Sequence, residues 1–521
     1  MTRRSSYSEG VAFGTLSFGV IGVVGLVTSV VTARIYGVEV LGEFALVYAP
    51  TALTWYVSTV KEQAALVREL STLAPRTPRV TALFAAVFTF SSGLTLLVSV
   101  LAVPVIVYAF QGPLDRPDLV VPACVTLASY AVLTNTGWNV DTVLSAFMAG
   151  RALFWIRLHQ AVSLLVFSVS FGLRQDVWGL VLATAVASAT SLVHRIVSVR
   201  AYVQVPIDAG ELRDGFTALP DLLRFGIKVA PGTIAQGVSN EVGTWVLAMV
   251  SSVAVVGAYN RAWSLGRRFL EVNYRITEML LPTLVRHRAE GHQDRFEEAL
   301  AQTLRYTSIG LLLPAAAAGG AAHAVMQLFG PGFERASGAL AVLLLIPTLL
   351  TLATVQAHAL YSVDRPLITT VISFARLGVT VAATVVLTDA LGTTGTALAL
   401  AAGYATDLAW KLVVVRKHLR RSWLELWPMH QILAVILAYV GGFATARAID
   451  RALEFPLDLV AALPAGSAAY AAVLVACGGV TRADWARIRD IVRLMFKRVG
   501  RPAAPPAPVA ASEAAVRDDV A

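Results

Sequence analysis

Charged residues are scarce in this sequence, and their scarcity excludes a soluble fold. Only 14% of the 521 residues are Asp, Glu, Lys or Arg, whereas 56% are apolar. Soluble domains carry about 25% charged residues. Apolar stretches of about 20 residues, long enough to cross a bilayer, recur along nearly the whole chain. The composition therefore predicts a membrane protein whose length reflects spanning helices and not soluble domains.

Cysteine is almost absent, and so is any motif for nucleotide hydrolysis. Cys124 and Cys477 both lie within apolar segments, which excludes a disulfide framework and a cysteine-based metal site. The phosphate-binding pattern Gly-x-x-x-x-Gly-Lys-Ser/Thr does not occur, so we do not expect this chain to hydrolyse ATP. We expect no cofactor, no metal and no catalytic residues, and coupling to H+ or Na+ stays open.

The net charge of +9 does not indicate nucleic-acid binding, because no basic run with interleaved aromatic residues lies on a soluble module. Lys and Arg fall mainly between the apolar segments. If the N-terminus is cytoplasmic, most of them lie in the inside connections, as the positive-inside rule requires. We therefore expect a multi-pass protein of the bacterial cytoplasmic membrane with both termini in the cytoplasm.

The apolar segments predict an all-α protein with about 14 transmembrane helices. These are expected near residues 11–33, 42–62, 81–109, 120–147, 153–172, 177–197, 227–249, 254–282, 305–326, 338–361, 367–388, 393–414, 431–449 and 458–478. The outside connections are short, and their acids, such as Asp450, look isolated. This argues against an external soluble domain and against an enzyme that needs clustered carboxylates.

An internal repeat at a shift of about 215 residues predicts two parallel lobes related by an axis along the membrane normal. The segment Val38-x-Val40-x-Gly42-x-Phe44 returns as Val253-x-Val255-x-Gly257-x-Tyr259, and Phe147-x-x-x-Arg151-x-Leu153 returns as Tyr361-x-x-x-Arg365-x-Leu367. Chance similarity among apolar residues is the alternative. The predicted organisation is an N-terminal six-helix lobe at 1–200, a cytoplasmic link at 201–224, a C-terminal six-helix lobe at 225–421, two additional transmembrane helices at 422–480, an amphipathic interfacial helix at 481–500 and a disordered tail at 501–521.

The span predicted near 254–282 carries more charge than a lipid-facing helix tolerates. At about 100° per residue, its charged side chains fall in one arc opposite an apolar face. They include Arg261, Arg267, Arg268, Glu271 and Arg275. Each arginine near the midplane would cost about 2.5–3.5 kcal/mol against lipid, so this stripe should face water or protein. It is net positive, and the arginine fork suits phosphate. Alternatively, the helix projects into the cytosol and leaves only Arg261 in the membrane.

Another arginine, Arg376, lies near the middle of the span predicted at 367–388. Two interpretations stay open for it: Arg376 joins the same cationic cavity, or it forms a structural ion pair. Asp407 and Lys411 are four residues apart on a predicted helix, a spacing that favours a structural pair.

Intramembrane acids are few, and each has two interpretations. Glu241 and Glu271 could titrate as coupling sites or balance an arginine. Asp141 is a further candidate for charge balance. In the first lobe we expect no buried arginine, because the nearest cations, Arg34 and Lys61, lie at helix ends.

Five segments carry a family resemblance over roughly residues 10–425. They are ARIYGVEVLGEFALV (33–47), EQAALVRE (62–69), VVGAYNRAWSLGRRF (255–269), LLPTLVRHRAEGHQDRFEEAL (280–300) and LFGPGFERASGALAVLLL (328–345). In order and spacing they resemble the Wzx-type polysaccharide transporters. These are flippases of lipid-linked oligosaccharides within the multidrug/oligosaccharidyl-lipid/polysaccharide (MOP) exporter superfamily.

The resemblance implies two lobes around a central cavity that opens alternately to either side of the membrane. The substrate would be a polyprenyl-(pyro)phosphate-linked oligosaccharide, moved to the outer leaflet for cell-surface polysaccharide assembly such as that of O-antigen. Arg261, Arg268 and Arg275 would meet the pyrophosphate, with Arg267 at the edge. Expected partners are the lipid-linked oligosaccharide, membrane lipids, and the polymerase and glycosyltransferases of the same pathway, but no nucleic acid. Alternatives are a lipid II flippase, a multidrug antiporter and, from another class, a membrane glycosyltransferase or polymerase.

Overall fold

The structure is a computed structural model that describes residues 7–71, 73–204, 209–363, 365–480 and 484. Within these ranges it leaves out some side chains, including those of residues 7–18 and 271–279. All regular elements in the described residues are helices. The interfacial helix predicted at 481–500 and the tail at 501–521 therefore lie outside the described residues, apart from Asp484.

The N-terminal lobe contains the six predicted spans. Its helices are α1 (Tyr7–Val57), α2 (Glu62–Leu70), α3 (Pro78–Gln111), α4 (Val120–Ser129), α5 (Asn135–Ala146), α6 (Gly150–Ser170) and α7 (Val177–Val199). Helix α1 holds two spans, because Gly37 interrupts it with φ 74° and ψ 176°, a conformation that glycine adopts without a steric penalty. A π-helical turn at Tyr130–Thr134 joins α4 to α5, so that these two helices form one span.

The C-terminal lobe and the two additional helices are likewise helical throughout their regular elements. They consist of α8 (Ala209–Val250), α9 (Val253–Ala289), α10 (Gln293–Gly320), α11 (Ala322–Gln327), α12 (Ser337–Leu343), α13 (Ile346–Ser362), α14 (Pro366–Arg416), α15 (Trp423–Leu426), α16 (Met429–Ala452) and α17 (Leu457–Ala476). Helix α14 again holds two spans, which meet at Gly392 with φ 56° and ψ −132°.

Nine segments of the described residues are long and apolar enough to cross a membrane. Two of them, containing α1 and α14, each hold two predicted spans. Helices α8, α9 and α10 are not among the nine, because polar and charged residues interrupt their apolar character. With these three helices the predicted 14 spans are complete, and the all-α class is confirmed. The three more polar helices include the one that carries the arginine stripe.

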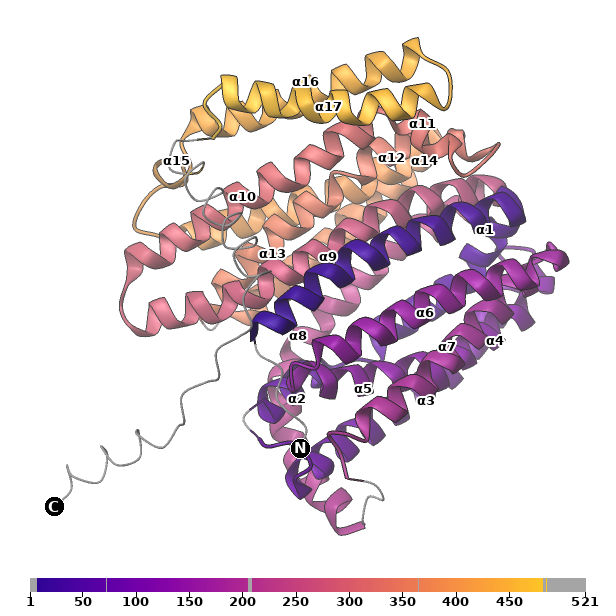
Figure 1. Cartoon of the computed structure of the whole chain (residues 1–521), viewed down its shortest axis with the longest axis vertical. Coiled ribbons are helices and arrows are strands. Elements are labelled where there is room, and N and C mark those ends of the chain that lie inside the picture. Colours follow the sequence, from indigo (N-terminus) through magenta and orange to yellow (C-terminus); the bar gives the residue numbers. More distant parts are fainter. Residues whose placement is uncertain (1–6, 72, 205–208, 364, 481–483, 485–521) are drawn as a thin grey trace.

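Figure 1 shows the two lobes side by side, with the α16 and α17 pair beyond α10 at the edge of the C-terminal lobe. Helix α8 packs on α1 and α3 of the first lobe and on α14 of the second. It begins at Ala209, inside the link predicted at 201–224, so most of that link is helical. The reason is burial, because Leu219 and Leu222 belong to the same apolar cluster as residues of α2 and α3.

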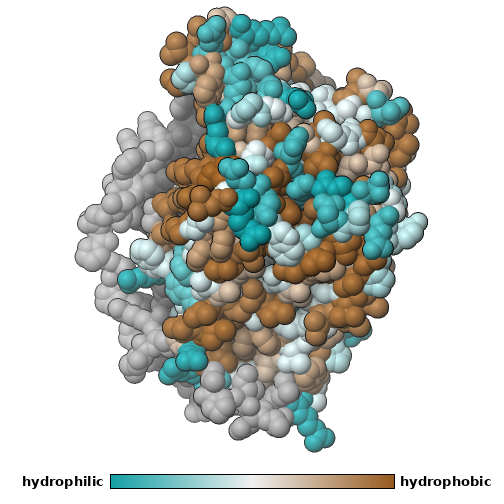
Figure 2. Space-filling model, turned by 90° about the vertical axis from the view of Figure 1, so that its right-hand side faces the viewer, coloured by the Kyte–Doolittle hydropathy of each residue, from teal (hydrophilic) through white to brown (hydrophobic). Residues whose placement is uncertain are grey.

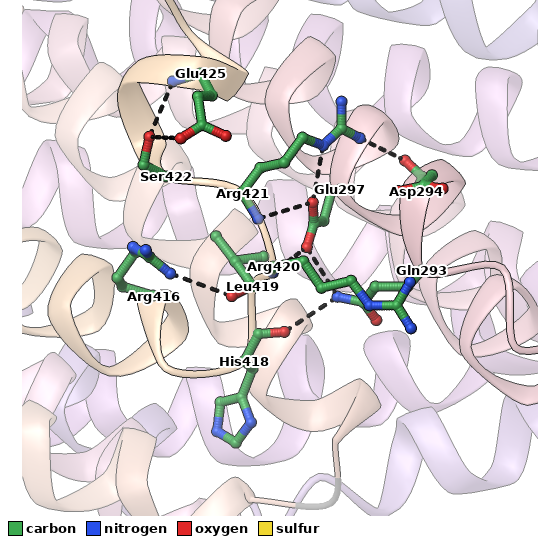
Figure 3. Close-up of polar contacts among 10 residues, drawn as sticks. All are labelled: Gln293, Asp294, Glu297, Arg416, His418, Leu419, Arg420, Arg421, Ser422 and Glu425. Carbon is green, nitrogen blue, oxygen red and sulfur yellow. Dashed lines mark hydrogen bonds and ion pairs between the residues drawn. The ribbon is translucent and has the colours of Figure 1, made fainter.

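Glu297 on α10 ties the connection after α14 to the rest of the lobe (Figure 3). Its buried carboxylate accepts hydrogen bonds from the backbone N–H groups of Arg420 and Arg421, from Arg421 Nε at 3.0 Å and from Gln293 Nε2 at 3.0 Å. Burial alone would raise the pKa of Glu297, but the hydrogen bonds outweigh burial and lower this pKa below its ordinary value.

The lobes meet at the end of the bundle where α1 bends at Gly37 and where α8 turns into α9. We call it the outer end, after the predicted orientation. A cluster of buried apolar residues connects Tyr36 of α1 with Tyr259 and Trp263 of α9 and with α12. Figure 2 looks at this end and shows apolar residues over much of the face and hydrophilic residues gathered in patches.

Candidate functional site

The described arginines of α9 lie against neighbouring helices. Arg261 donates from Nη1 to Ser29 Oγ at 2.6 Å, and its guanidinium lies 5.8 Å from the centre of the Phe329 ring. Arg268 donates from Nη2 to the backbone carbonyl of Gly25 at 2.6 Å. Ser29 and Gly25 are on α1, so the C-terminal lobe presents these two charges to the first lobe.

Gly25 makes room for Arg268. A Cβ atom at position 25 would lie 2.3 Å from Arg268 Nη1, closer than real Cβ contacts come. Arg268 can approach the α1 backbone this closely only because residue 25 has no side chain. The carbonyl of Gly25 and the Ser29 hydroxyl are neutral, so they orient the guanidinium groups without cancelling their charge.

The charge of Arg267 is compensated by a carboxylate. It donates from Nη2 to Glu241 Oε1 at 2.7 Å, and its guanidinium lies 5.1 Å from the centre of the Trp263 ring. The Glu241 side chain is only 5% exposed. Of the two interpretations given above for Glu241, charge balance is therefore the one that the contacts favour.

The residue beside Glu241 links the two lobes. Asn240 donates from Nδ2 to the hydroxyl of Tyr56 on α1 at 3.4 Å, and its Oδ1 accepts a hydrogen bond from the hydroxyl of Tyr404 on α14 at 2.7 Å. The Arg267 and Glu241 pair therefore lies beside a polar contact between α1 and the C-terminal lobe. Glu271 and Arg275 have side chains outside the described residues, so the inner end of the stripe stays a prediction.

Arg376 belongs to a separate buried network. It is 1% exposed, its guanidinium stacks 4.9 Å from the centre of the Tyr404 ring, and its Nη1 lies 3.9 Å from Asp407 Oδ2. Lys411 donates to the same Asp407 oxygen at 2.8 Å, so the predicted pair of Asp407 and Lys411 is present. These contacts favour the structural ion pair over a place for Arg376 in the cationic stripe.

Asp141 lies in a similar network in the first lobe. This network contains an arginine, Arg195, that was not predicted from the sequence. Arg195 on α7 is 3% exposed and donates from Nε and Nη2 to the two Asp141 oxygens at 2.8 and 3.1 Å. Ser191 and Gln160 accept its remaining hydrogen bonds. The expectation of no buried arginine in this lobe is therefore wrong. The intramembrane Asp141 was the available signal, because a buried carboxylate requires a cationic partner.

Three residues of one network correspond in the predicted repeat to three residues of the other. At a shift of 216 residues, Gln160 corresponds to Arg376, Ser191 to Asp407 and Arg195 to Lys411. Each lobe thus buries its polar side chains at the same places with different chemistry. The internal repeat stays a prediction, with chance similarity as its alternative.

The outer end holds a contact between the lobes that we call the outer lobe contact, formed by Val38, Gly42, Val253 and Gly257. A Cβ atom on Gly42 would lie 2.0 Å from the Val253 carbonyl oxygen, and one on Gly257 would lie 2.1 Å from the Val38 carbonyl oxygen. These are the residues of the repeated motif, and their contacts are reciprocal, as the predicted axis between the lobes requires. Glycine is required at both positions because the backbones touch.

Next to this contact, Arg34 also connects the lobes. It donates from Nε to the carbonyl of Leu328 at 2.9 Å and from Nη2 to the carbonyl of Gln327 at 3.0 Å, both at the end of α11. These carbonyls end a helix and carry partial negative charge, which suits a guanidinium.

The family model for polysaccharide biosynthesis proteins matches residues 8–287, more than half of the chain. The chain belongs to this family. Among solved structures, the inward closed form of the lipid II flippase MurJ is similar with a TM-score of 0.66 at 13% identity, over 89% of this chain and 98% of that one. An outward-facing multidrug resistance MATE transporter of the MOP superfamily has a TM-score of 0.57 at 16% identity, over 80% and 98%.

An inward-facing MATE transporter of the same superfamily is also similar, with a TM-score of 0.55 at 15% identity, over 80% of this chain and 95% of that one. Among curated proteins, none matches this sequence. The family match confirms the predicted resemblance to polysaccharide transporters, and the solved structures show that this polysaccharide biosynthesis protein has the fold of MOP-superfamily transporters. At these identities the solved structures establish the fold, and the substrate has to be argued from the residues.

Proposed function

We propose that this protein flips a polyprenyl-(pyro)phosphate-linked oligosaccharide from the inner to the outer leaflet of a bacterial cytoplasmic membrane, with both of its termini in the cytoplasm. The family match and the MOP fold support the class of activity. The observation that carries the substrate chemistry is Arg261, which extends from one lobe to the other and has no carboxylate partner among the described residues.

An ionised headgroup needs a cationic side chain such as that of Arg261 in order to cross the membrane. Moving an ion from water into a low-dielectric medium costs on the order of 20 kcal/mol before relaxation. Arg261 and Arg268 would lower this cost by binding the phosphate oxygens through their planar donor forks. Arg267 is paired with Glu241, so its role would be to hold α8 and α9 together beside the phosphate. The polyprenyl chain would remain in lipid throughout.

The contacts of these arginines also suit a transport mechanism in which the two lobes separate. Arg261 and Arg268 now bind Ser29 and Gly25 of the first lobe. When the lobes move apart, these neutral acceptors are exchanged for phosphate oxygens, and at Arg261 no ion pair with a described carboxylate has to be broken. Alternating access would therefore cost little at Arg261.

We propose the membrane potential as the driving force. With the cell interior negative, the export of two negative charges gains about 4–5 kcal/mol at 100 mV. The pathway would place this step after the glycosyltransferases that build the lipid-linked glycan and before the polymerase that consumes it. Coupling to H+ or Na+ is testable by imposing either gradient without a potential.

The test is flipping of a radiolabelled polyprenyl-pyrophosphoryl oligosaccharide in proteoliposomes. We expect Arg261→Ala to lower the flipping rate about 10- to 100-fold, the loss of one charge-assisted hydrogen bond, and Arg261→Lys to restore part of it. The matched control is Arg174→Gln, which removes an exposed arginine whose partner is Asp176 of the same loop. Wild-type flipping by Arg261→Ala would refute the phosphate role.

The same vesicles separate the alternatives. Transport of lipid II in preference to the oligosaccharide lipid would assign a lipid II flippase. Efflux of a cationic dye with no lipid flipping would indicate a multidrug antiporter. Chemical turnover of the lipid-linked sugar by the purified chain would indicate a glycosyltransferase or polymerase.

A further inference from the structure

A polar pocket lies at the outer end, away from the arginine stripe, where α11 meets α16 and α17. Its volume is about 450 Å³. Asp450 of α16 lies in this pocket together with Glu454 and with Asp458 of α17. The prediction that Asp450 is an isolated acid is therefore wrong. The three acids are spaced four residues apart across a helix end, and the turn between α16 and α17 brings them together.

The walls of the pocket are fixed by buried contacts. The Asp450 side chain is 1% exposed, and it accepts hydrogen bonds from the Ala324 backbone N–H at 2.9 Å and from Arg447 Nη1 at 3.0 Å. Asp458 is 2% exposed and accepts the N–H of Leu459 at 2.6 Å. A site whose polar groups are held in this way does not have to be ordered by its ligand, so it binds at a lower entropic cost.

Other lining groups remain available to a ligand. Arg451 and Glu454 are exposed, and neither side chain has a partner among the described residues. His323 and Gln327 of α11 contact each other at 3.1 Å and form the opposite wall. Phe455 is 38% exposed and adds an aromatic face to the same pocket.

The charge of the pocket decides what class of ligand fits. The lining contains two arginines and three acids, so its charge is close to neutral with a slight excess of acid. These residues are Arg447, Arg451, Asp450, Glu454 and Asp458. A phosphate or another anion would meet three carboxylates and is disfavoured. A neutral ligand with many hydroxyl groups can both donate to the carboxylates and accept from the guanidinium groups. The volume lies within the usual range for small-molecule sites, about 300–1,000 Å³.

We propose that this pocket binds sugar units of a glycan at the outer end of the protein. The proposal rests on the flippase function and on the predicted orientation, which together bring a glycan to this side of the membrane. Figure 2 shows hydrophilic residues gathered at the top of the outer face, over the turn between α16 and α17.

The pocket also adjoins the contact between the lobes. Gln327 lines the pocket, and its backbone carbonyl accepts the hydrogen bond from Arg34 of the first lobe. A glycan in the pocket therefore lies one residue away from an interaction that holds the two lobes together. This position would retain the leading sugars of the glycan on the outer side while the lobes separate and close again.

The experiment compares two substrates that share the polyprenyl-pyrophosphate anchor, one with a single sugar and one with the full oligosaccharide from the producing strain. The variant is Arg451→Gln with Glu454→Gln, which removes two exposed charges and leaves the buried Asp450 and Asp458 in place. The control is Arg174→Gln. We expect the double variant to raise the half-saturating concentration of the oligosaccharide lipid about fivefold or more and to leave that of the monosaccharide lipid unchanged.

Equal behaviour of the variant and wild type on both lipids would overturn the proposal, and so would an equal loss on both. If wild-type protein flips neither lipid, the proposed function fails, and the pocket is then judged by direct binding. The probe for that arm is the free oligosaccharide released from the same lipid pool, measured by saturation-transfer NMR on the detergent-purified protein. Binding that the double variant abolishes would support the sugar site, and absence of binding to wild type would refute it.

Discussion

Substitution of Gly42 by alanine tests the outer lobe contact. The new Cβ atom would lie 2.0 Å from the Val253 carbonyl oxygen, whereas real Cβ contacts are essentially never below 3.0 Å, so the backbones must separate by about 1 Å at this point. Overpacking of this kind costs typically about 1–3 kcal/mol. If Gly42→Ala leaves each lobe intact, the cost applies only to the state in which the lobes touch here, and that state loses about 5- to 150-fold in population.

Spin labels on Glu39→Cys and Arg335→Cys, both exposed at the outer end, would report the separation of the lobes by electron double resonance. The two native cysteines are removed first. We expect Gly42→Ala to shift the distance distribution to longer values, and Gly257→Ala to do the same because it opposes the equivalent carbonyl. Gly310→Ala on α10 is the control, since a Cβ there meets nothing within 4 Å. An unchanged distribution in a folded Gly42→Ala protein would refute the reasoning.

Three further predictions concern single contacts. Gly25→Ala should displace the flexible end of Arg268 and slow flipping at nearly unchanged thermal stability, which comparison of transport rate with melting temperature checks. Asp141→Asn should destabilise the protein by about 3–5 kcal/mol, because Arg195 keeps a buried charge without its ion pair, and Arg195→Leu in the same chain should recover part of the melting temperature. Because the pKa of Glu297 is lowered in the folded state, its carboxylate stabilises the fold. This stabilisation is fully present above the ordinary pKa of 4.5 and is lost as the pH falls through the lower folded-state pKa. Glu297→Gln should therefore reduce the fall in melting temperature at acid pH.

The sequence predicted the helices well because a membrane span leaves a local signal. Length and apolar character sufficed for the spans in nine segments, two of which bend at Gly37 and Gly392, and the more polar α8, α9 and α10 complete the 14. The arginines of α9 were found because helical periodicity places them on one face. What the sequence could not show depends on pairing across the fold. Arg195 remained hidden because its partner Asp141 is 54 residues away. The outer pocket remained hidden because the turn between α16 and α17 assembles it.

The repeat also separates features that serve the fold from features that serve a substrate. Gly42 corresponds to Gly257, and both are required where the lobes touch, so this feature is needed twice. The arginine stripe has no such counterpart. At the shift of 215 residues that relates the two glycines, Arg261 corresponds to Leu46 and Arg268 to Leu53.

Leu53 lines an apolar crevice of about 330 Å³, together with residues of α3 and Trp245 of α8. One half therefore offers guanidinium groups where the other offers leucine. Under the proposed function, that asymmetry suits an amphiphile with one anionic group and a long apolar chain better than a substrate charged throughout, because Arg261 and the crevice at Leu53 match the two parts of such a molecule.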